Sequence, residues 1–335
     1  MIDKKKKNYG IALLRVKLSF MVILDHFYDK ERKKAIINII YYHIPTFFLL
    51  SFYFNYNSFA TFNISKIKLR FERLSIPYFC WSLISLILNN IYFYLLKRKC
   101  RHTLYDFLDC LLNGRDLIVS LWFQNILILT TLIISIVLFS FKNEYILIFH
   151  ILMILAYILQ YSGKNLNFFN TRFNHTYLNT YGRLINTFPD SLTGFFLPAY
   201  NIINKLILYK KTNIVISLII IIFLSKYEFD NNLFIFKYGG IRLNIASVCI
   251  FFIFYSLGGN IRNKKTIKIF DIITNYTPGI YFIHNLIGRG YIIPNILGNK
   301  LKTFFGCLVI YLVCFILCFL LDQLFGKTRF RHLIK

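Results

Sequence analysis

Charged residues are scarce in this chain of 335 residues, and acidic ones are the scarcest, since 14 Asp and Glu stand against 40 Lys and Arg. Charged residues make up 16% of the sequence, whereas about a quarter is typical of soluble globular proteins. This shortage excludes an ordinary soluble protein. Disorder requires low hydrophobicity, and 57% of the residues are hydrophobic, so a disordered chain is excluded as well.

The sequence also lacks the motifs of common soluble enzymes. It contains no glycine-rich phosphate loop, no HExxH, no GxSxG and no Asp-rich metal motif. None of the seven cysteines forms a CxxC pair, and most lie within apolar runs, so we interpret them as small hydrophobic residues. We therefore expect no bound metal. No internal repeat of fixed period is visible.

Long apolar runs recur from one end of the chain to the other. A spanning helix needs about 20 residues, so ten such helices would use roughly 200 residues, which matches the apolar fraction. We expect an all-α, polytopic integral membrane protein with a single membrane domain over residues 1–335. The ten predicted spans are about 11–28, 36–57, 74–97, 118–140, 144–162, 186–206, 212–228, 243–259, 276–296 and 303–326.

The basic residues lie mostly in short loops between the apolar runs. A net charge of +26 also suits a nucleic-acid binder, but this distribution favours membrane-flanking charge, so we expect a lipid bilayer and no nucleic acid as partner. Lys4 to Lys7 favour a cytoplasmic N-terminus in a plasma or inner membrane, and an even number of spans places the C-terminus there too. Arg15 and Lys17 interrupt the first apolar stretch, so we expect no cleaved signal peptide.

Two segments outside the spans have a recognisable character. Residues 101–113 carry apolar side chains at helical spacing, which predicts an amphipathic helix lying on the membrane. Residues 163–185 form the longest polar stretch, and we expect it to contact an acceptor substrate.

The first predicted span carries ionisable residues, which are costly within a membrane and usually functional. Arg15 and His26 are separated so that they lie about 20° apart on one helix face and roughly 16 Å apart along the axis. This face would offer a fixed cation at one depth and a titratable base at another. Alternatively, Arg15 reaches lipid phosphates and His26 caps the helix at the interface. Geometry alone leaves both interpretations open.

Lys66, Arg70 and Arg73 lie at the spacing i, i+4, i+7, which puts them on one helix face just before the third span. Arginine binds phosphate through its planar, bidentate fork, so this stripe fits a phosphate-rich ligand such as coenzyme A at the cytoplasmic surface. A positive anchor at the membrane surface would have the same pattern.

Tyr281 and His284 are i, i+3 neighbours in the ninth predicted span, and Asn285 and Arg289 extend the polar face. A single intramembrane histidine is often structural, and we interpret the other histidines that way. These are His43, His102, His150, His175 and His332.

Seven short motifs, taken in order over about residues 8–326, resemble those of membrane acyltransferase family 3. They are Arg15 and His26 in RVKLSFMVILDH, Arg70 and Arg73 in RFER, IPTFFLLSFYF at 44–54, Pro77, Tyr78 and Trp81 in PYFCW, LWF at 121–123, Pro189 and Gly194 in FPDSLTGFF, and Gly279, Tyr281 and His284 in GIYFIH.

The resemblance implies an O-acyltransferase that moves an acyl group, typically acetyl, from acyl-CoA to a hydroxyl of a cell-surface glycan or a lipid-linked sugar. Such O-acetylation modifies surface polysaccharides. His26 and Arg15 would be catalytic, and Arg70 and Arg73, with Lys66 beside them, would bind acyl-CoA. The further candidates are Ser51, Trp122, Tyr281 and His284.

His26 would act as general base on the acceptor hydroxyl or would transiently carry the acyl group, because the pKa of an ordinary histidine lies near the working pH. The sequence leaves both roles open. Asp25 cannot easily orient His26, because adjacent helical residues point about 100° apart. An orienting partner must therefore come from another span.

The sequence departs from the family pattern at a few positions. Phe52 stands where many members have glycine, and Gln124 and Asn125 stand where some larger members have a glutamate. We expect no esterase-like domain after the last span, so the chain resembles the compact, membrane-only members.

Two other functions stay open at this point. A transporter or flippase of a lipid-linked sugar would also use polar spans and basic loops, although transporters often show an internal repeat that is missing here. A non-catalytic subunit of glycan assembly would tolerate the departure at Phe52.

Overall fold

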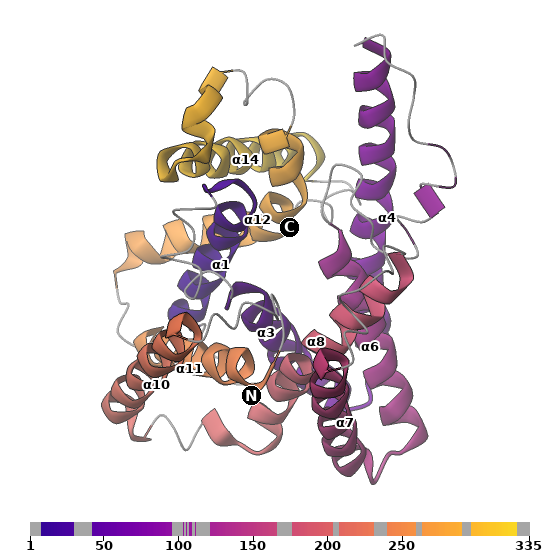
Figure 1. Ribbon diagram of the computed structural model, residues 1–335, viewed down its shortest axis with the longest axis vertical. Coiled ribbons are helices and arrows are strands. Elements are labelled where there is room, and N and C mark those ends of the chain that lie inside the picture. Colours follow the sequence, from indigo (N-terminus) through magenta and orange to yellow (C-terminus); the bar gives the residue numbers. More distant parts are fainter. Residues whose placement is uncertain are drawn as a thin grey trace.

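The computed structural model describes residues 8–29, 42–95, 103, 105, 107, 108, 111, 121–165, 176–203, 208–230, 240–258, 263–289 and 296–326 (Figure 1). These residues form α1 (Tyr9–Phe27), α3 (His43–Ala60), α4 (Ile64–Leu95), α6 (Trp122–Ser140), α7 (Tyr145–Asn165), α8 (Thr176–Ala199), α10 (Lys210–Asp230), α11 (Ile241–Leu257), α12 (Lys264–Arg289), the short 3-10 helix η2 (Gly298–Lys302) and α14 (Phe304–Phe325). The part of the chain that the structure describes contains no strand, so the all-α prediction is confirmed.

Each predicted span coincides with one of these α-helices, but three of them begin about ten residues earlier than predicted. These are α4, α8 and α12. Asn63 caps α4 by accepting from the backbone N–H of Lys66, at 3.0 Å. Asn263 caps α12 by accepting from the backbone N–H of Lys265, at 2.9 Å. The added turns are polar, so a hydropathy pattern omits them although they are helical.

Pro77 lies near the start of the span predicted at 74–97, but because α4 begins earlier, this proline is inside the helix. The structure also places Pro189 and Pro198 inside α8 and Pro278 inside α12. Each proline removes one backbone hydrogen bond, yet the helices continue through it, as membrane helices held by their neighbours can.

Four described helices are long and apolar enough to cross a membrane, judged by length and composition alone. They are Ile64–Leu88, Trp122–Ser140, Tyr145–Ser162 and Phe304–Phe325. This is fewer than the ten expected. Helix α1 is not among the four, because it carries three charged residues, Arg15, Lys17 and Asp25, within its 19 residues. Helix α11 is apolar but short, with 17 residues.

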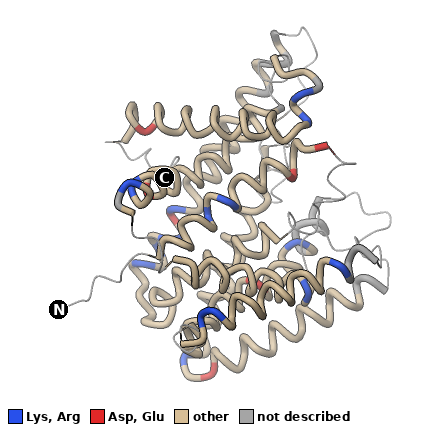
Figure 2. Tube along the Cα trace, turned by 90° about the vertical axis from the view of Figure 1, so that its left-hand side faces the viewer, with Lys and Arg blue, Asp and Glu red and all other residues tan. Residues whose placement is uncertain are grey.

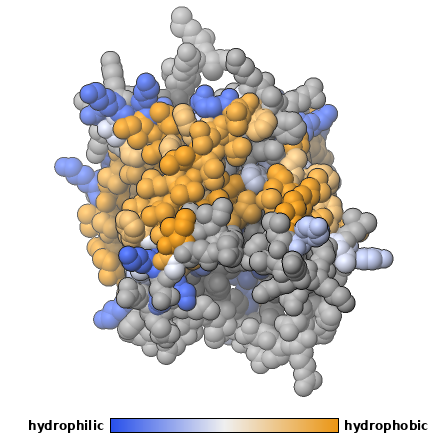
Figure 3. Space-filling view, turned by 90° about the horizontal axis from the view of Figure 1, so that it is seen from above, coloured by the Kyte–Doolittle hydropathy of each residue, from blue (hydrophilic) through white to orange (hydrophobic). Residues whose placement is uncertain are grey.

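The outside of the molecule is strongly apolar. Ile154 on α7, Ile222 on α10 and Ile316 on α14 are each more than half exposed, and many apolar neighbours on the same helices are exposed too. Figure 3 shows a broad continuous apolar area on one face, and Figure 2 shows how few charged residues interrupt the chain. Soluble monomers rarely expose apolar surface on this scale, so these faces fit contact with lipid.

The directions of the helices follow from contacts at their ends. The ring centroids of His26 and His284 lie 5.1 Å apart and Arg15 donates to Thr277, so α1 and α12 run parallel. The backbone N–H of Asp29 donates to the carbonyl oxygen of Lys302, which brings the start of α14 to the end of α1. Further from these ends, the hydroxyl oxygens of Ser19 on α1 and Tyr311 on α14 lie 3.3 Å apart, so α14 is antiparallel to α1.

The start of α1 lies beside the end of α11, because the side chain of Asn8 donates to the carbonyl oxygen of Tyr255 at 3.0 Å. Phe62, just after α3, contacts Phe139 near the end of α6 and Tyr145 at the start of α7.

Glycine allows close helix packing at several positions, of which Gly194 and Gly288 lie at contacts of the elements around the site. A Cβ atom on Gly194 of α8 would lie 2.1 Å from the carbonyl oxygen of Leu49 on α3. A Cβ atom on Gly288 of α12 would lie 2.2 Å from the ring of Phe27 on α1. Neither distance permits a side chain without movement, so glycine sets how closely these helices approach.

Two predicted segments can be followed only in part. Most of 101–113 lies outside the described residues, and so does the middle of 163–185, whose two ends belong to α7 and α8.

Candidate functional site

A cavity of about 510 Å³ lies among α1, α3, α4, α6 and α12, and we call it the central cavity. Polar side chains from all five helices line it among apolar ones. The polar lining residues are Arg15, Ser51, Asn55, Arg73, Gln124, Thr277 and Tyr281. Four of the predicted site residues thus meet at one cavity, namely Arg15, Ser51, Arg73 and Tyr281.

Arg15 is held in place from the neighbouring helix. Its guanidinium donates to the hydroxyl oxygen of Thr277 on α12, at 3.2 Å. Arg15 also lines a second cavity, described below, so it lies where the two cavities adjoin. A fixed cation at this place suits an anionic group that extends from one cavity into the other.

Arg70 is buried beside the central cavity and is absent from the residues that line it. Its Nη2 donates to Ser51 Oγ at 3.0 Å, its Nη1 to the Ser51 carbonyl oxygen at 3.3 Å, and its Nε to Thr131 Oγ1 at 3.1 Å. The guanidinium also lies 4.7 Å from the ring centroid of Phe52 and 5.8 Å from that of Phe59. Arg70 therefore joins α4 to α3 and α6 and fixes Ser51.

Arg73 and Lys66 are both exposed on α4, but only Arg73 lines the central cavity. Arg70 and Arg73 are three positions apart, so their side chains differ by about 60° around α4. Arg70 is buried against α3 and α6, whereas Arg73 lies at the cavity. Lys66 lies near the start of α4 and lines neither cavity.

The two predicted histidines form a pair near the ends of α1 and α12, with ring centroids 5.1 Å apart, whereas Arg15 lies in the first half of α1. His284 is fully buried, and its Nδ1 lies 2.5 Å from the carbonyl oxygen of Tyr281. We expected a partner that orients His26 to come from another helix, and His284 lies on α12, whereas His26 lies on α1. Neither histidine lines the central cavity or the second one, but the ring of Tyr281, which lines the central cavity, lies 5.8 Å from that of His284.

Trp122 is buried in a different environment from the other candidates. The guanidinium of Arg183 lies 4.7 Å from the centroid of its ring. Its neighbour Phe123 lines the central cavity instead, and the Phe123 and Tyr281 rings are 5.3 Å apart.

Asn55, Gln124 and Thr277 line the cavity and were not among the predicted site residues. Asn55 donates to the Ser51 carbonyl oxygen at 2.7 Å, and Gln124 donates to the Leu74 carbonyl oxygen at 3.0 Å. Spacing offered a signal for two of them, because Asn55 follows Ser51 by one turn and Thr277 precedes Tyr281 by one turn.

Comparisons with protein-family models, with curated proteins and with solved structures find no match to this chain. The arrangement places two cations, Arg15 and Arg73, at a polar cavity. Tyr281 lines the same cavity and lies beside the imidazole pair of His26 and His284. Such a set can bind an anionic ligand at one end and move a proton at the other.

Proposed function

We propose that this protein is a membrane O-acyltransferase of the kind its motifs resemble, membrane acyltransferase family 3. It would transfer an acyl group, normally acetyl, from acyl-CoA to a hydroxyl of a cell-surface glycan or a lipid-linked sugar. The observation that carries the proposal is the central cavity, where Arg15 and Arg73 lie in an apolar bundle and Tyr281 leads to the His26–His284 pair.

The proposal includes ten membrane crossings. The contacts at the helix ends support it, because α1 begins where α11 ends, and α14 begins where α1 ends. Successive crossings produce this alternation. Polar functional residues lower the hydropathy of α1 and α12, which would cross the membrane shielded by their neighbours.

In the proposed reaction, Arg15 and Arg73 bind the phosphates of acyl-CoA, and the thioester reaches the histidine pair. His26 takes the proton of the acceptor hydroxyl while the hydroxyl oxygen attacks the thioester carbonyl carbon. The carbon–sulfur bond then breaks, and the coenzyme A thiolate takes the proton back from His26. Transfer through an acyl-histidine remains the other route, in which His26 attacks the thioester first.

Calorimetric titration of acetyl-CoA into the full chain in nanodiscs tests the proposal. We expect saturable binding that an unrelated nucleotide does not reproduce and that the Arg70→Ala/Arg73→Ala variant loses. Absence of binding to folded wild-type protein would contradict the transferase. Transport of a lipid-linked sugar without consumption of labelled acyl-CoA would then explain the protein better.

A further inference from the structure

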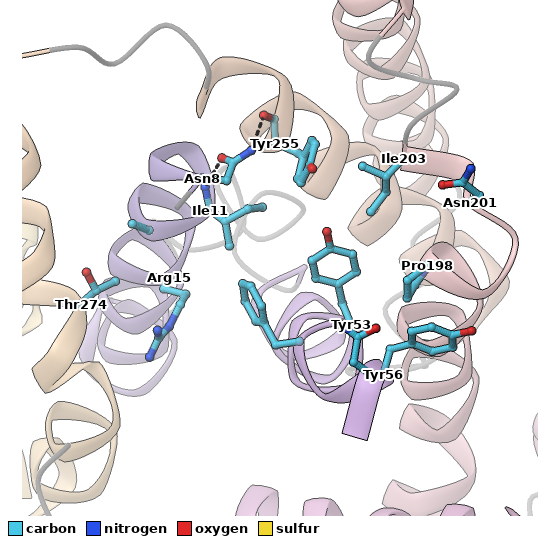
Figure 4. A pocket seen from close by; sticks show the side chains of 13 residues that line it. Asn8, Ile11, Arg15, Tyr53, Tyr56, Pro198, Asn201, Ile203, Tyr255 and Thr274 are labelled. Atoms are coloured by element: carbon cyan, nitrogen blue, oxygen red, sulfur yellow. Dashed lines mark hydrogen bonds between the residues drawn. The ribbon is translucent and has the colours of Figure 1, made fainter. Parts of the chain in front are cut away.

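A second cavity, of about 690 Å³, adjoins the central one, and we call it the aromatic cavity. It lies at the end of the bundle where α1 begins and where α3, α8 and α11 end (Figure 4). Its wall contains three tyrosines, Tyr53, Tyr56 and Tyr255, and three asparagines, Asn8, Asn57 and Asn201. Nothing in the mechanism above uses this space.

The tyrosines are positioned by contacts with aromatic neighbours. Tyr53 packs edge-on against Phe251 and against Tyr255, with ring centroids 5.0 Å and 6.5 Å apart. Tyr56 packs edge-on against Phe195 at 5.0 Å. Figure 4 shows Tyr53 projecting from α3 toward Ile11 and Tyr255, with Tyr56 beside Pro198.

The chemistry of this lining suits a flat, uncharged heterocycle. Aromatic rings stack on a base with little dependence on its identity, and amide side chains such as that of Asn57 offer both a donor and an acceptor to its edge. Among the residues that line the cavity in the described part of the chain, none is acidic, and Arg15 is the cation. An anion attached to the heterocycle would therefore meet a positive charge.

The two cavities are joined by shared residues, Arg15 and Phe54. From the aromatic cavity the order is tyrosines, then Arg15 and Arg73, then the rest of the polar central cavity, then Tyr281 and the histidine pair. This order matches the parts of an acyl-CoA molecule, which are the adenine ring, the phosphates, the pantetheine arm and the thioester.

We propose that the aromatic cavity binds the adenine nucleotide of the acyl-CoA donor, with Tyr53 and Tyr56 against the purine and Arg15 at the adjoining phosphates. This inference rests on the proposed function, because it assigns a place to one part of that enzyme's donor. It also assigns a direction, since the donor enters at the end where α1 begins and its thioester points toward His26.

The test compares two donors that differ only in the nucleotide. Acetyl-CoA and acetyl-phosphopantetheine are titrated into the full-length protein in nanodiscs, for wild type, Tyr56→Leu and Tyr53→Leu. The control is Tyr161→Leu, which replaces an exposed tyrosine on α7 outside both cavities. Adenosine 3′,5′-bisphosphate is used as a third probe, to report on the nucleotide alone.

We expect wild type to bind acetyl-CoA more tightly than acetyl-phosphopantetheine. Tyr56→Leu should weaken acetyl-CoA binding about tenfold, the usual loss when one stacked ring is removed, and should abolish competition by the bisphosphate. Binding of acetyl-phosphopantetheine should stay unchanged, which also shows that the variant is folded. Tyr161→Leu should behave as wild type.

Two results would overturn the inference, and they have different meanings. If wild type prefers acetyl-CoA and both cavity variants keep that full preference, the nucleotide binds elsewhere and the enzyme proposal survives. If wild type binds neither donor, the acyltransferase proposal fails, and the assignment of the aromatic cavity fails with it.

Discussion

Arg70 and Arg73 show how one basic motif serves two purposes. Arg70 donates hydrogen bonds to Ser51 and Thr131 and lies over the ring of Phe52, whereas Arg73 is exposed at the central cavity. Phe52 is also the residue that stands where the resembled family has glycine. Here its ring is fully buried and supports the Arg70 guanidinium, so the departure has a structural role in this chain.

The first prediction separates these two arginines. Arg73→Ala should raise the dissociation constant for acetyl-CoA about tenfold, because a charged hydrogen bond to phosphate is lost, and should leave the unfolding midpoint unchanged. Arg70→Ala should lower the free energy of unfolding by about 1–3 kcal/mol, because Ser51 and Thr131 lose their buried donor. Titration and thermal unfolding of each variant provide the two measurements.

Lys68→Ala is the matched control, since Lys68 is an exposed cation on the same helix and lines neither cavity. Equal losses of acetyl-CoA affinity in Lys68→Ala and Arg73→Ala would show that only overall charge matters, and would contradict a specific role for Arg73.

The second prediction concerns the histidine pair. His26→Ala should reduce acyl transfer by about 10²–10⁴-fold, the usual contribution of a positioned base, and should leave acetyl-CoA affinity within about twofold. Affinity is preserved because His26 lines neither cavity. Transfer and binding are measured on the same nanodisc preparation.

His150→Ala serves as the control for the histidine experiment. His150 lies within α7, where it stacks on Phe196 and bonds to the Ile146 carbonyl oxygen, far in sequence from the pair. Full transfer activity in His26→Ala would exclude His26 from the reaction.

At the residue scale, the sequence identified charged and ionisable members of the site better than neutral ones. Arg15, Arg73 and Tyr281 were candidates and lie at the central cavity, as does one neutral candidate, Ser51, while the neutral residues Asn55, Gln124 and Thr277 were missed. An ionisable residue in an apolar run stands out by its cost. A neutral amide or hydroxyl is common in membrane helices, and only tertiary packing decides whether it faces a cavity.

At the scale of elements, the parallel pair α1 and α12 positions both ends of the proposed site. Arg15 donates to Thr277 near one end, and His26 lies beside His284 near the other. Between Phe27 and Gly288 the helices approach so closely that a Cβ atom has no room. The separation of the histidines therefore depends on this glycine.

The third prediction follows from that contact. Gly288→Ala should lower the free energy of unfolding by about 1–3 kcal/mol, because the ring of Phe27 must move. It should also reduce transfer more than acetyl-CoA binding, since the Phe27 ring lies 6.2 Å from that of His26 and 6.3 Å from that of His284.

Addition of Phe27→Leu to Gly288→Ala should restore part of the stability and the transfer, because a smaller side chain makes room for the new methyl group. A double variant no better than Gly288→Ala alone would show that this contact does not set the helix separation.

The apolar runs of the sequence predicted where helices lie, but they did not predict where three of these helices begin. Helices α4, α8 and α12 begin in polar sequence, and the first of them continues through Pro77. A hydropathy pattern detects only the apolar part of a helix. The helix itself extends into polar sequence where a cap such as Asn63 or Asn263 satisfies its first N–H groups.

At the scale of the whole molecule, α1 begins and α14 ends at the same end of the bundle. The first turn of α14 adjoins the last turn of α1, and Tyr276, in the first half of α12, donates to Asp322 near the end of α14. This placement agrees with an even number of crossings.

The fourth prediction is that both termini face the cytoplasm. Protease-cleavable tags at the N-terminus and at the C-terminus should both be cleaved in inside-out vesicles and both be protected in right-side-out vesicles. Cleavage of the two tags from opposite sides would require an odd number of crossings, and would contradict the ten-helix topology.

The most direct test of the acyltransferase is transfer of label in membranes. Membranes containing wild-type protein, His26→Ala or no added protein are incubated with acetyl-CoA labelled in the acetyl group, and label is measured in the lipid and polysaccharide fractions. Alkali-labile label, as expected of an O-ester, should appear in these fractions with wild type alone. Label that remains on coenzyme A with wild type, or that is transferred equally by His26→Ala, would contradict the proposed acyltransferase.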